Sequence, residues 1–330
     1  ARLFTAHGHS VTTVCGIGGG TAAVRLPEDK SAQAQVTALR PVLSVQDVVF
    51  VHNVMTMPFH LGLTEALGRL AEELPGVRFI AWVHDVAARN PDYRRTPPLI
   101  RSVHPCFEYV AVSPLRARDF QRAVHDPTVR CRVVPNGLDP ARVLGLPPSV
   151  AEFAREHCLL DGRMILLHPA RLLPRKGIEK SLAVAQALRT RGIPATVLVT
   201  AARDPHRDWN HLFTRELHHL AVNRSAIFVS DHLTVGDEEL SGLYVLADAL
   251  IFPSRREGFG LPLLEAAMHR LPVFCSDIEP LRDLLRENAT LFRHDAKAPD
   301  IAARIAAVLD SSPAHRERKR ILREFSWPFI

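Results

Sequence analysis

Short apolar runs alternate with amphipathic stretches along most of this chain, and the alternation predicts an α/β fold. Residues 78–83 (RFIAWV) and 164–168 (MILLH) have the length and continuous apolar character of buried parallel strands. Residues 61–74 instead repeat leucine at helical spacing, as expected for a helix with one buried face. Units of this kind, repeated along a chain, form parallel sheets covered by helices.

The same reading predicts further elements in both halves of the chain. The strands expected in the first half cover residues 11–15, 47–52, 78–83, 109–113 and 131–135. Those in the second half cover 164–168, 195–200, 226–230, 249–253, 272–275 and 289–292. The expected helices cover 61–74, 115–124, 149–158 (capped by Ser149), 178–191, 238–247, 261–270, 301–309 and 316–324.

A length of 330 residues suggests two domains, which we place at residues 1–143 and 144–330. The boundary follows Asn136-Gly137-Leu138-Asp139, where Asn and Gly suit a tight turn. Residues 1–8 have the character of a helix end, although an α/β domain normally begins with a strand. We therefore expect the first strand to be missing.

Charge narrows the class of partner. The formal net charge is +6, with 15 Lys and Arg against 12 Asp and Glu in residues 1–139 and 26 against 23 in the remainder. This even division favours an enzyme with anionic ligands over a nucleic-acid-binding protein, and it leaves weak attraction to an anionic membrane open.

Cysteine usage and hydropathy bear on the compartment. The five cysteines form no C-x-x-C pair, and we expect buried free thiols in a reducing cytosol. No stretch approaches the roughly 20 apolar residues of a membrane span, and no signal peptide is evident. We expect a cytoplasmic protein, either free or peripheral to the inner face of the membrane.

Residues 247–285 read as one unit of strand, glycine-bearing turn, helix and strand. The helix from Leu261 begins after a glycine turn, where free N–H groups and the helix dipole favour an anion. Its expected apolar face carries Leu263, Leu264, Ala267 and Met268.

Two carboxylates bracket this turn. Glu257 lies in the loop and Glu265 about one helical turn after Leu261. Carboxylates accept hydrogen bonds from sugar hydroxyls, so the arrangement suits a nucleotide sugar bound beyond the strand ends. The alternative is that Glu257 is a solvated loop charge and Glu265 a surface helix residue.

Two other patterns are weaker evidence for a ligand site. The glycines of 16–20 follow a strand, but Pro27 and the charged residues after it break the long helix that a dinucleotide fingerprint needs, so we expect a flexible loop. A histidine cluster lacks cysteine or close carboxylate partners, and we expect no metal site there. Its members are His206, His211, His218 and His219.

The stretch EGFGLPLLEA, after ADALIFPS and before PVFCSD, resembles the donor-site signature of retaining glycosyltransferases of family 4. The similarity extends from about Gly8 to Trp327. Since residues 325–327 resemble the start of the family's last helical segment, the resemblance implies that the last helix is shortened. It implies the GT-B fold, in which two Rossmann-like domains with doubly wound parallel sheets face each other across a cleft.

The resemblance implies roles on the donor side. Arg171 and Lys176, five residues apart, would meet the donor diphosphate and stabilise the charge that the leaving group gains. The alternative is a basic surface turn, with Arg175 only a neighbour. Glu257 would hold sugar hydroxyls and Glu265 the ribose. The remaining donor-binding residues would be Gly258, Phe259, Gly260, Leu261, and, against the base, His232 and Leu233.

Other residues belong to the acceptor side by the same resemblance. His84, at the end of a predicted strand, would reach the transferred sugar. Asp85 would orient His84 or contact the acceptor. Arg94 and Arg95 fit an anionic acceptor and equally fit solvated loop charges. Because the protein itself supplies cations, no metal or other cofactor is expected.

The implied reaction is transfer of a hexose from a nucleoside-diphosphate sugar to an acceptor hydroxyl with retention. GDP-mannose and UDP-glucose are the leading donors, and a glycan, a lipid or a small polar molecule is the acceptor. Three alternatives stay open: a nucleotide-sugar epimerase, a non-catalytic sugar-nucleotide-binding protein and a nucleic-acid binder.

Overall fold

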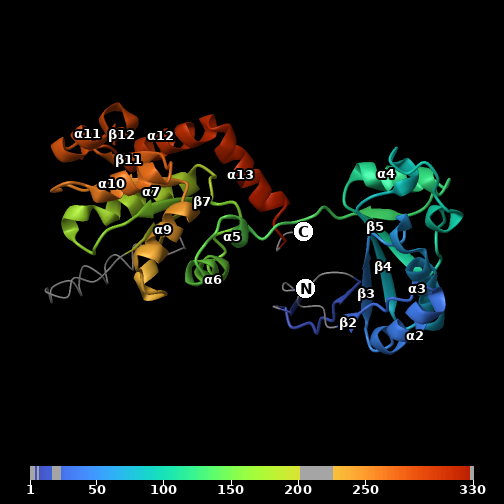
Figure 1. Cartoon of the computed structure of the whole chain (residues 1–330). Helices are drawn as coiled ribbons and strands as arrows, with labels where there is room; N and C mark the ends of the chain where they lie inside the picture. The colour runs from blue at the N-terminus through green and yellow to red at the C-terminus, as the bar shows by residue number, and fades with distance from the viewer. Residues whose placement is uncertain (1–3, 6, 17–23, 201–225, 328–330) are drawn as a thin grey trace. The chain divides into compact units, whose positions relative to one another are not determined.

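A computed structural model describes residues 4–5, 7–16, 24–200 and 226–327 of the chain (Figure 1). The chain divides into two compact units, one ending at Gly137 and the other beginning at Leu138. The division falls inside the predicted turn at 136–139, whereas the sequence-based boundary lies after Val143. Each unit is described by itself.

The first unit is built on a parallel sheet with the strand order β3-β4-β5-β6. Its strands are β3 (Val48–His52), β4 (Arg78–Val83), β5 (Phe107–Ala111) and β6 (Cys131–Val133). A second, two-stranded parallel sheet pairs β1 (Val14–Cys15) with β2 (Val24–Arg25). The sheets confirm parallel strands in this half of the chain.

Three helices share one hydrophobic core with the four-stranded sheet, and Figure 1 shows them beside it. They are α2 (Ala32–Leu43), α3 (Leu61–Glu73) and α4 (Pro114–Ala123). The sequence pattern predicted α3 and α4 but missed α2. The miss has a physical cause: the buried face of α2 includes Gln35, whose amide donates to the Asp29 carbonyl at 2.6 Å instead of presenting an apolar side chain.

The second unit contains a parallel sheet with the order β12-β11-β10-β7-β8-β9. The strands are β7 (Met164–His168), β8 (Ala195–Val199), β9 (Ala226–Phe228), β10 (Ala249–Phe252), β11 (Val273–Ser276) and β12 (Thr290–Phe292). The strand order reverses at the β7–β10 pair. In open α/β sheets, ligands bind outside the carboxyl ends of the strands at such a point.

Helices cover both faces of this sheet because strand residues alternate between two cores. Leu166 contributes to the core under α7 (Ile178–Thr190) and α12 (Ala298–Ser311). Leu167 contributes to the opposite core. The helices packed on that second face are α5 (Pro140–Val143), α6 (Pro148–Glu156), α9 (Asp237–Leu246), α10 (Leu261–Met268) and α11 (Glu279–Leu285).

The last helix, α13 (Pro313–Glu324), is held by a buried ion pair. Lys319 Nζ lies 2.6 Å from Asp248 Oδ2 and also donates to the Arg163 carbonyl at 2.5 Å. After the helix, Leu138 N–H donates to the Phe325 carbonyl at 2.8 Å. These contacts fix the middle and the C-terminal end of α13 within the second unit.

Short 3-10 helices complete the connections. They are η1 (Pro58–His60), η2 (Ala87–Arg89), η3 (Pro98–Arg101), η4 (Pro174–Lys176), η5 (Val229–Asp231) and η6 (Arg286–Asn288).

Three local predictions were wrong. Ser149 does not cap α6: it lies inside the helix, and its hydroxyl donates to Glu239 at 3.0 Å. The buried face of α10 consists of Leu263 and Ala266, whereas Met268 is 84% exposed. The cysteines are not uniformly buried, since Cys275 is buried but Cys106 and Cys158 are exposed.

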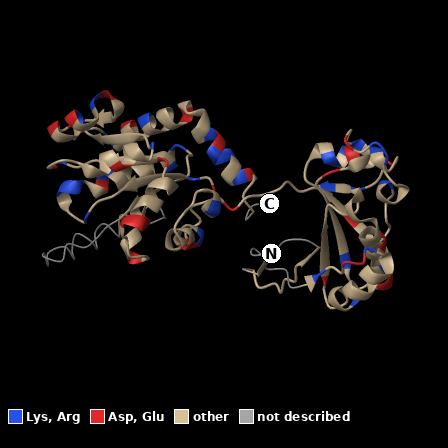
Figure 2. Cartoon of the chain, viewed as in Figure 1, with Lys and Arg blue, Asp and Glu red and all other residues tan. Residues whose placement is uncertain are grey.

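Charges of both signs are interspersed over both units (Figure 2). On α13, Arg320 pairs with Glu317 at 2.6 Å and Glu324 at 2.8 Å, so this basic helix carries its own counterions. Within the described residues, no helix combines the length and apolarity needed to cross a membrane.

Candidate functional site

Two loops at the carboxyl ends of β7 and β10 are joined by an ion pair. Lys176 Nζ lies 2.5 Å from Glu257 Oε1, and the two side chains are only 13% and 9% exposed. The ammonium also lies over the ring of Phe252, 5.2 Å from its centroid. Because β7 and β10 are neighbours in the sheet, the fold brings a β7 loop cation to a β10 loop carboxylate.

Arginines strengthen the connection between these loops. Arg175 Nη1 donates to the Arg256 carbonyl at 2.8 Å and lies 3.8 Å from Glu257 Oε1. Arg255 N–H donates to the Arg175 carbonyl at 2.7 Å, and its guanidinium pairs with Glu179 at 2.9 Å. Arg175 is therefore part of the cluster rather than only a neighbour of Lys176.

Gly177 permits the close approach of the two loops. It has a φ of 68°, and a Cβ atom there would lie 2.4 Å from the Pro253 carbonyl oxygen. Left-handed backbone and missing space both favour glycine. The same residue is the N-cap of α7, so it fixes where the helix begins relative to Lys176.

A buried histidine lies at the end of β7. The His168 ring is fully buried, and its Nδ1 lies 2.8 Å from the Ser181 hydroxyl oxygen. Burial, assisted by the charge of Lys176, lowers the pKa of His168 to about 3. The ring is neutral at physiological pH, so it adds no charge beneath the Lys176–Glu257 pair. Sequence reasoning did not single it out, although a polar residue ending an apolar strand is a usable signal.

The turn after Glu257 leads directly into α10. Gly260 has a φ of 106°, and a Cβ atom there would lie 2.6 Å from Leu281 Cδ2. Phe259 and Leu261 are 55% and 60% exposed. The first turn of a helix presents N–H groups without helical partners, which favours an anion. Here Pro262 has no N–H group and the Leu263 N–H donates to the Gly260 carbonyl at 3.0 Å, so only the other N–H groups of this turn can serve an anion.

Glu265 is fixed by a buried tyrosine. The Tyr244 hydroxyl donates to Glu265 Oε2 at 2.7 Å, and the tyrosine ring stacks on His269 at 5.2 Å. Burial and the nearby carboxylate raise the pKa of Tyr244 well above its usual range. Sequence reasoning placed Tyr244 in the core, where it lies, but did not foresee the partner of its hydroxyl.

The other predicted donor residues lie apart from these contacts. Arg171 is exposed, and in the described part of the chain its guanidinium makes no hydrogen bond or ion pair with another side chain. His232 packs its ring against His157 at 4.3 Å. Leu233 is partly buried against the core under α6 and α9. The structure thus brings Lys176 to Glu257 but shows no contact of Arg171 with either.

In the first unit, His84 belongs to a different cluster. Its Nε2 lies 3.2 Å from Nδ1 of His52, the residue that ends β3. Burial lowers the pKa of both imidazoles, and the charge of His84 lowers that of His52 further. Sequence reasoning missed His52, although it is a polar residue at a strand end like His84.

The loop after His84 is fixed by backbone and ionic contacts. The side-chain oxygen of Asn53 accepts from the N–H groups of His84 at 3.2 Å and Asp85 at 2.9 Å. The Asp85 carboxylate pairs with Arg116 at 2.9 Å, so the ring of His84 is oriented by His52 instead.

Arg94 and Arg95 are both exposed, and neither makes a hydrogen bond or ion pair with another side chain among the described residues. They are available to a ligand and equally to solvent, as the sequence left open.

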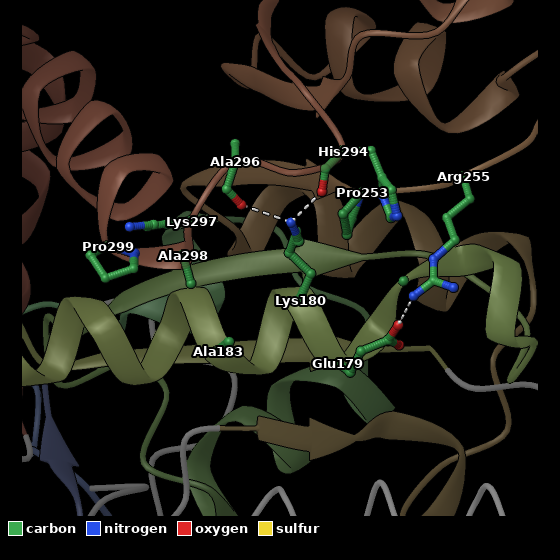
Figure 3. Close-up of a pocket in the computed structure, with 11 residues that line it drawn as sticks. Glu179, Lys180, Ala183, Pro253, Arg255, His294, Ala296, Lys297, Ala298 and Pro299 are labelled. Carbon is green, nitrogen blue, oxygen red and sulfur yellow. Dashed lines mark hydrogen bonds and ion pairs between the residues drawn. The ribbon is translucent and has the colours of Figure 1, made fainter.

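A cavity of about 530 Å³ lies behind the β7 and β10 loops, between the start of α7 and the start of α12 (Figure 3). Its polar groups are largely paired with each other. Lys180 Nζ donates to the His294 carbonyl at 2.6 Å and the Ala296 carbonyl at 2.8 Å, and Arg255 pairs with Glu179. The cavity therefore offers few free groups to select a ligand.

No group of three or more His, Cys, Asp or Glu among the described residues is arranged to hold a metal ion. The histidines at 206, 211, 218 and 219, and the glycines at 18–20, lie outside the described residues.

Comparison with known proteins assigns the second unit to a family. The family described as "Glycosyl transferases group 1" matches residues 150–324, which contain the β7 and β10 loops, Tyr244 and Glu265. The chain belongs to this family. The first unit lies outside the matched residues.

Two curated relatives illustrate the similarity. The serotype-specific mannosyltransferase WbdA of Escherichia coli is 35% identical over 131 residues, covering 39% of this chain and 15% of that protein. A glycogen synthase of Mycobacterium tuberculosis is 32% identical over 206 residues, covering 60% of this chain and 45% of that protein. The chain thus spans less than half the length of either relative.

Among solved structures, WaaG, a glycosyltransferase involved in lipopolysaccharide biosynthesis, aligns with 99% of this chain and 89% of its own, at 18% identity and a TM-score of 0.40.

Proposed function

We propose that this chain transfers a hexose from a nucleoside-diphosphate sugar to an acceptor hydroxyl, with retention and without a metal, as a family 4 glycosyltransferase of the GT-B type. The observation that carries the proposal is the Lys176–Glu257 pair at 2.5 Å, in the part of the chain that matches the family. The pair puts a phosphate-binding cation next to a sugar-binding carboxylate.

The chemistry of the Lys176 ammonium and the Glu257 carboxylate supports these two roles. An ammonium has three N–H donors, and among the described residues Lys176 uses one of them, on Glu257. The others remain for phosphate oxygens. Transfer breaks the bond between the anomeric carbon and a diphosphate oxygen, and a fixed cation stabilises the charge that this oxygen gains.

Other residues extend the site in the same proposal. Arg171 reaches the diphosphate, and the turn at 258–261 presents backbone N–H groups to phosphate and sugar. Glu265 accepts from the ribose, and the base lies against His232 and Leu233. All of these belong to the second unit, which we assign to the donor.

The first unit would serve the acceptor. His84 contacts the transferred sugar, Asp85 holds Arg116 and the loop in place, and Arg94 and Arg95 attract an anionic acceptor. The acceptor is a glycan, a lipid or a small polar molecule, and the donor is GDP-mannose or UDP-glucose. One relative above is named a mannosyltransferase and the other a glycogen synthase, which supports the proposal of a sugar transferase. We place the protein in the cytoplasm, free or at the membrane surface.

Calorimetric titration with UDP, GDP and ADP tests the donor site. We expect one nucleotide to bind, and the affinity to fall at least tenfold in Lys176→Ala and in Glu265→Ala, because each removes a charge-assisted hydrogen bond. A folded chain that binds none of the three would overturn the proposal.

Product analysis with the matching nucleotide sugar tests turnover. We expect release of the nucleoside diphosphate. We also expect an α-linked product when the donor is α-linked. Binding without transfer or hydrolysis would instead identify a non-catalytic sugar-nucleotide-binding protein, and conversion of the sugar without an acceptor would identify an epimerase.

A further inference from the structure

Tyr244 connects the core of the second unit to the candidate ribose-binding carboxylate. The residue belongs to α9 and is 1% exposed, packed in the core on the α9–α10 face of the sheet. Its hydroxyl leaves this core to meet Glu265 Oε2, at 2.7 Å, on the neighbouring helix. A buried ring on one helix thus determines the position of a carboxylate on another.

The hydroxyl has a single proton and a clear choice of acceptor. The Pro262 carbonyl lies 3.3 Å away, and Glu265 Oε2 is nearer by more than half an ångström. Hydrogen bonds to charged acceptors are shorter and stronger than those to neutral ones, so the proton points to the carboxylate. The stacked ring of His269, at an interplanar angle of 7°, restricts the tyrosine further.

The contact divides the two oxygens of Glu265 between protein and ligand. Oε2 is occupied by Tyr244, whereas no side-chain contact to Oε1 is present among the described residues. Glutamate has several rotatable bonds, and holding it in one conformation has an entropic cost when a ligand must do so alone. A carboxylate that the protein has already fixed loses less conformational entropy when it binds a hydroxyl.

We infer that Tyr244 is a positioning residue that fixes Glu265 for the ribose, and that the pair sets the preference for ribonucleotides over deoxyribonucleotides. The inference rests on the proposed function, because it assumes a nucleoside diphosphate at this site. A hydroxyl bonded to a fixed carboxylate contributes about tenfold or more in affinity. A deoxynucleotide lacks that hydroxyl and gains nothing from the fixed carboxylate.

Paired titrations measure this preference directly. UDP, GDP and ADP are each compared with their 2′-deoxy and 3′-deoxy counterparts on the wild-type chain and on Tyr244→Phe. We expect the wild type to prefer the ribonucleotide at least tenfold over one of the deoxy forms. Tyr244→Phe should reduce that ratio to about threefold or less while leaving deoxynucleotide affinity nearly unchanged.

A matched control separates positioning from general loss of stability. Tyr109→Phe also removes a buried hydroxyl, one that accepts from His104 N–H at 2.9 Å in the first unit. We expect its ribonucleotide preference to equal that of the wild type. If Tyr244→Phe fails to fold, His269→Leu removes the stacked ring instead, and we expect it to lower the same ratio by a smaller factor.

The outcomes distinguish this inference from the proposed function. An unchanged ratio in folded Tyr244→Phe would show that the hydroxyl is structural and would overturn the inference. Where only His269→Leu folds, an unchanged ratio in that variant would show that the orientation of Tyr244 does not matter, which would also overturn the inference. Binding of every diphosphate by the wild type without a ribonucleotide preference would also overturn it, yet would leave the donor site standing. Absence of binding to all nine ligands would remove the proposed function and the inference together.

Discussion

The ammonium of Lys176 and the carboxylate of Glu257 lie 2.5 Å apart although 81 positions separate them in the sequence. One follows β7 and the other follows β10, and these strands pair in parallel through Leu167 and Leu250. The contact is therefore a consequence of strand order. In the proposed function, the donor would meet a cation and an acceptor that the two neighbouring loops hold in place.

Replacing Glu257 by glutamine should lower both stability and transfer. The substitution keeps the shape of the side chain but leaves the nearly buried Lys176 ammonium without its counterion. We expect the free energy of unfolding to fall by about 1–3 kcal/mol, as for other buried charged hydrogen bonds. Urea unfolding followed by circular dichroism measures the change.

Glu179→Gln is the matched control for this experiment. Glu179 also pairs with a cation of the opposite loop, but the Arg255 and Glu179 side chains are 51% and 36% exposed. Exposed ion pairs contribute at most about 1 kcal/mol. Equal decreases in the free energy of unfolding would contradict the expectation that burial makes the Lys176–Glu257 pair the more stabilising of the two.

Gly177→Ala should disturb the same site through the backbone. Alanine there adopts a strained left-handed conformation, which costs about 1 kcal/mol, and its Cβ atom also collides with the Pro253 carbonyl. Relieving that collision moves Lys176 away from the β10 loop, so we expect a further loss of about 1–3 kcal/mol and weaker diphosphate binding.

Gly192→Ala isolates the backbone contribution. Gly192 has a φ of 80°, but a Cβ atom there meets nothing within 4 Å. Thermal unfolding of the two variants should show the larger decrease in midpoint for Gly177→Ala. Similar decreases in the two midpoints would indicate that the loops move apart at Pro253 without a further loss of stability.

The buried His168 makes stability depend on pH in a defined direction. Its pKa is lowered to about 3 in the folded chain from an ordinary 6.5, so the unfolded chain binds a proton between these values that the folded chain does not. The contribution to stability is complete above pH 6.5 and is lost as the pH falls toward 3. Between pH 7 and pH 5 the loss is about 2 kcal/mol.

Comparing the wild type with His168→Gln removes the contributions of other titrating groups. Glutamine keeps a hydrogen-bonding side chain near Ser181 but has no titrating proton. The stability difference between the two chains should shrink as the pH is lowered from 7 to 5. A difference that stays constant over this range would mean that His168 is protonated equally in both states.

The strands and helices that could be predicted from the sequence are those whose buried positions are occupied by apolar residues. β4 and β7 have the predicted bounds because each is a continuous apolar run ended by polar residues. β5 lies at 107–111 rather than 109–113, since the apolar run there extends past the strand at its carboxyl end. α2 was missed because Gln35, a polar residue, fills a core position.

The candidate site also contains residues that the sequence indicates and contacts that it does not. Glu257 and Glu265 could be selected from sequence because they bracket a glycine turn after a strand, and Lys176 was selected through the resemblance to family 4. The partners of these residues could not, because they depend on which strands and helices are neighbours. The Tyr244 contact joins α9 to α10, and the His52 contact joins β3 to β4. Neither relationship is encoded in local spacing.

A last prediction separates binding from transfer. His84 belongs to the first unit, whereas every residue assigned to the nucleotide belongs to the second. We therefore expect His84→Ala to leave nucleoside-diphosphate affinity within about twofold of the wild type. In the proposed function His84 contacts the transferred sugar, so its removal should lower kcat at least tenfold.

His52→Ala should produce a smaller version of the same effect, since it removes the ring that orients His84 without removing His84 itself. Both variants are compared with His294→Ala, which replaces an exposed histidine outside the proposed donor and acceptor residues. Titration gives the affinity and steady-state kinetics give kcat. Loss of nucleotide affinity in folded His84→Ala would mean that the first unit contributes to donor binding directly, and the assignment of donor and acceptor to separate units would have to be abandoned.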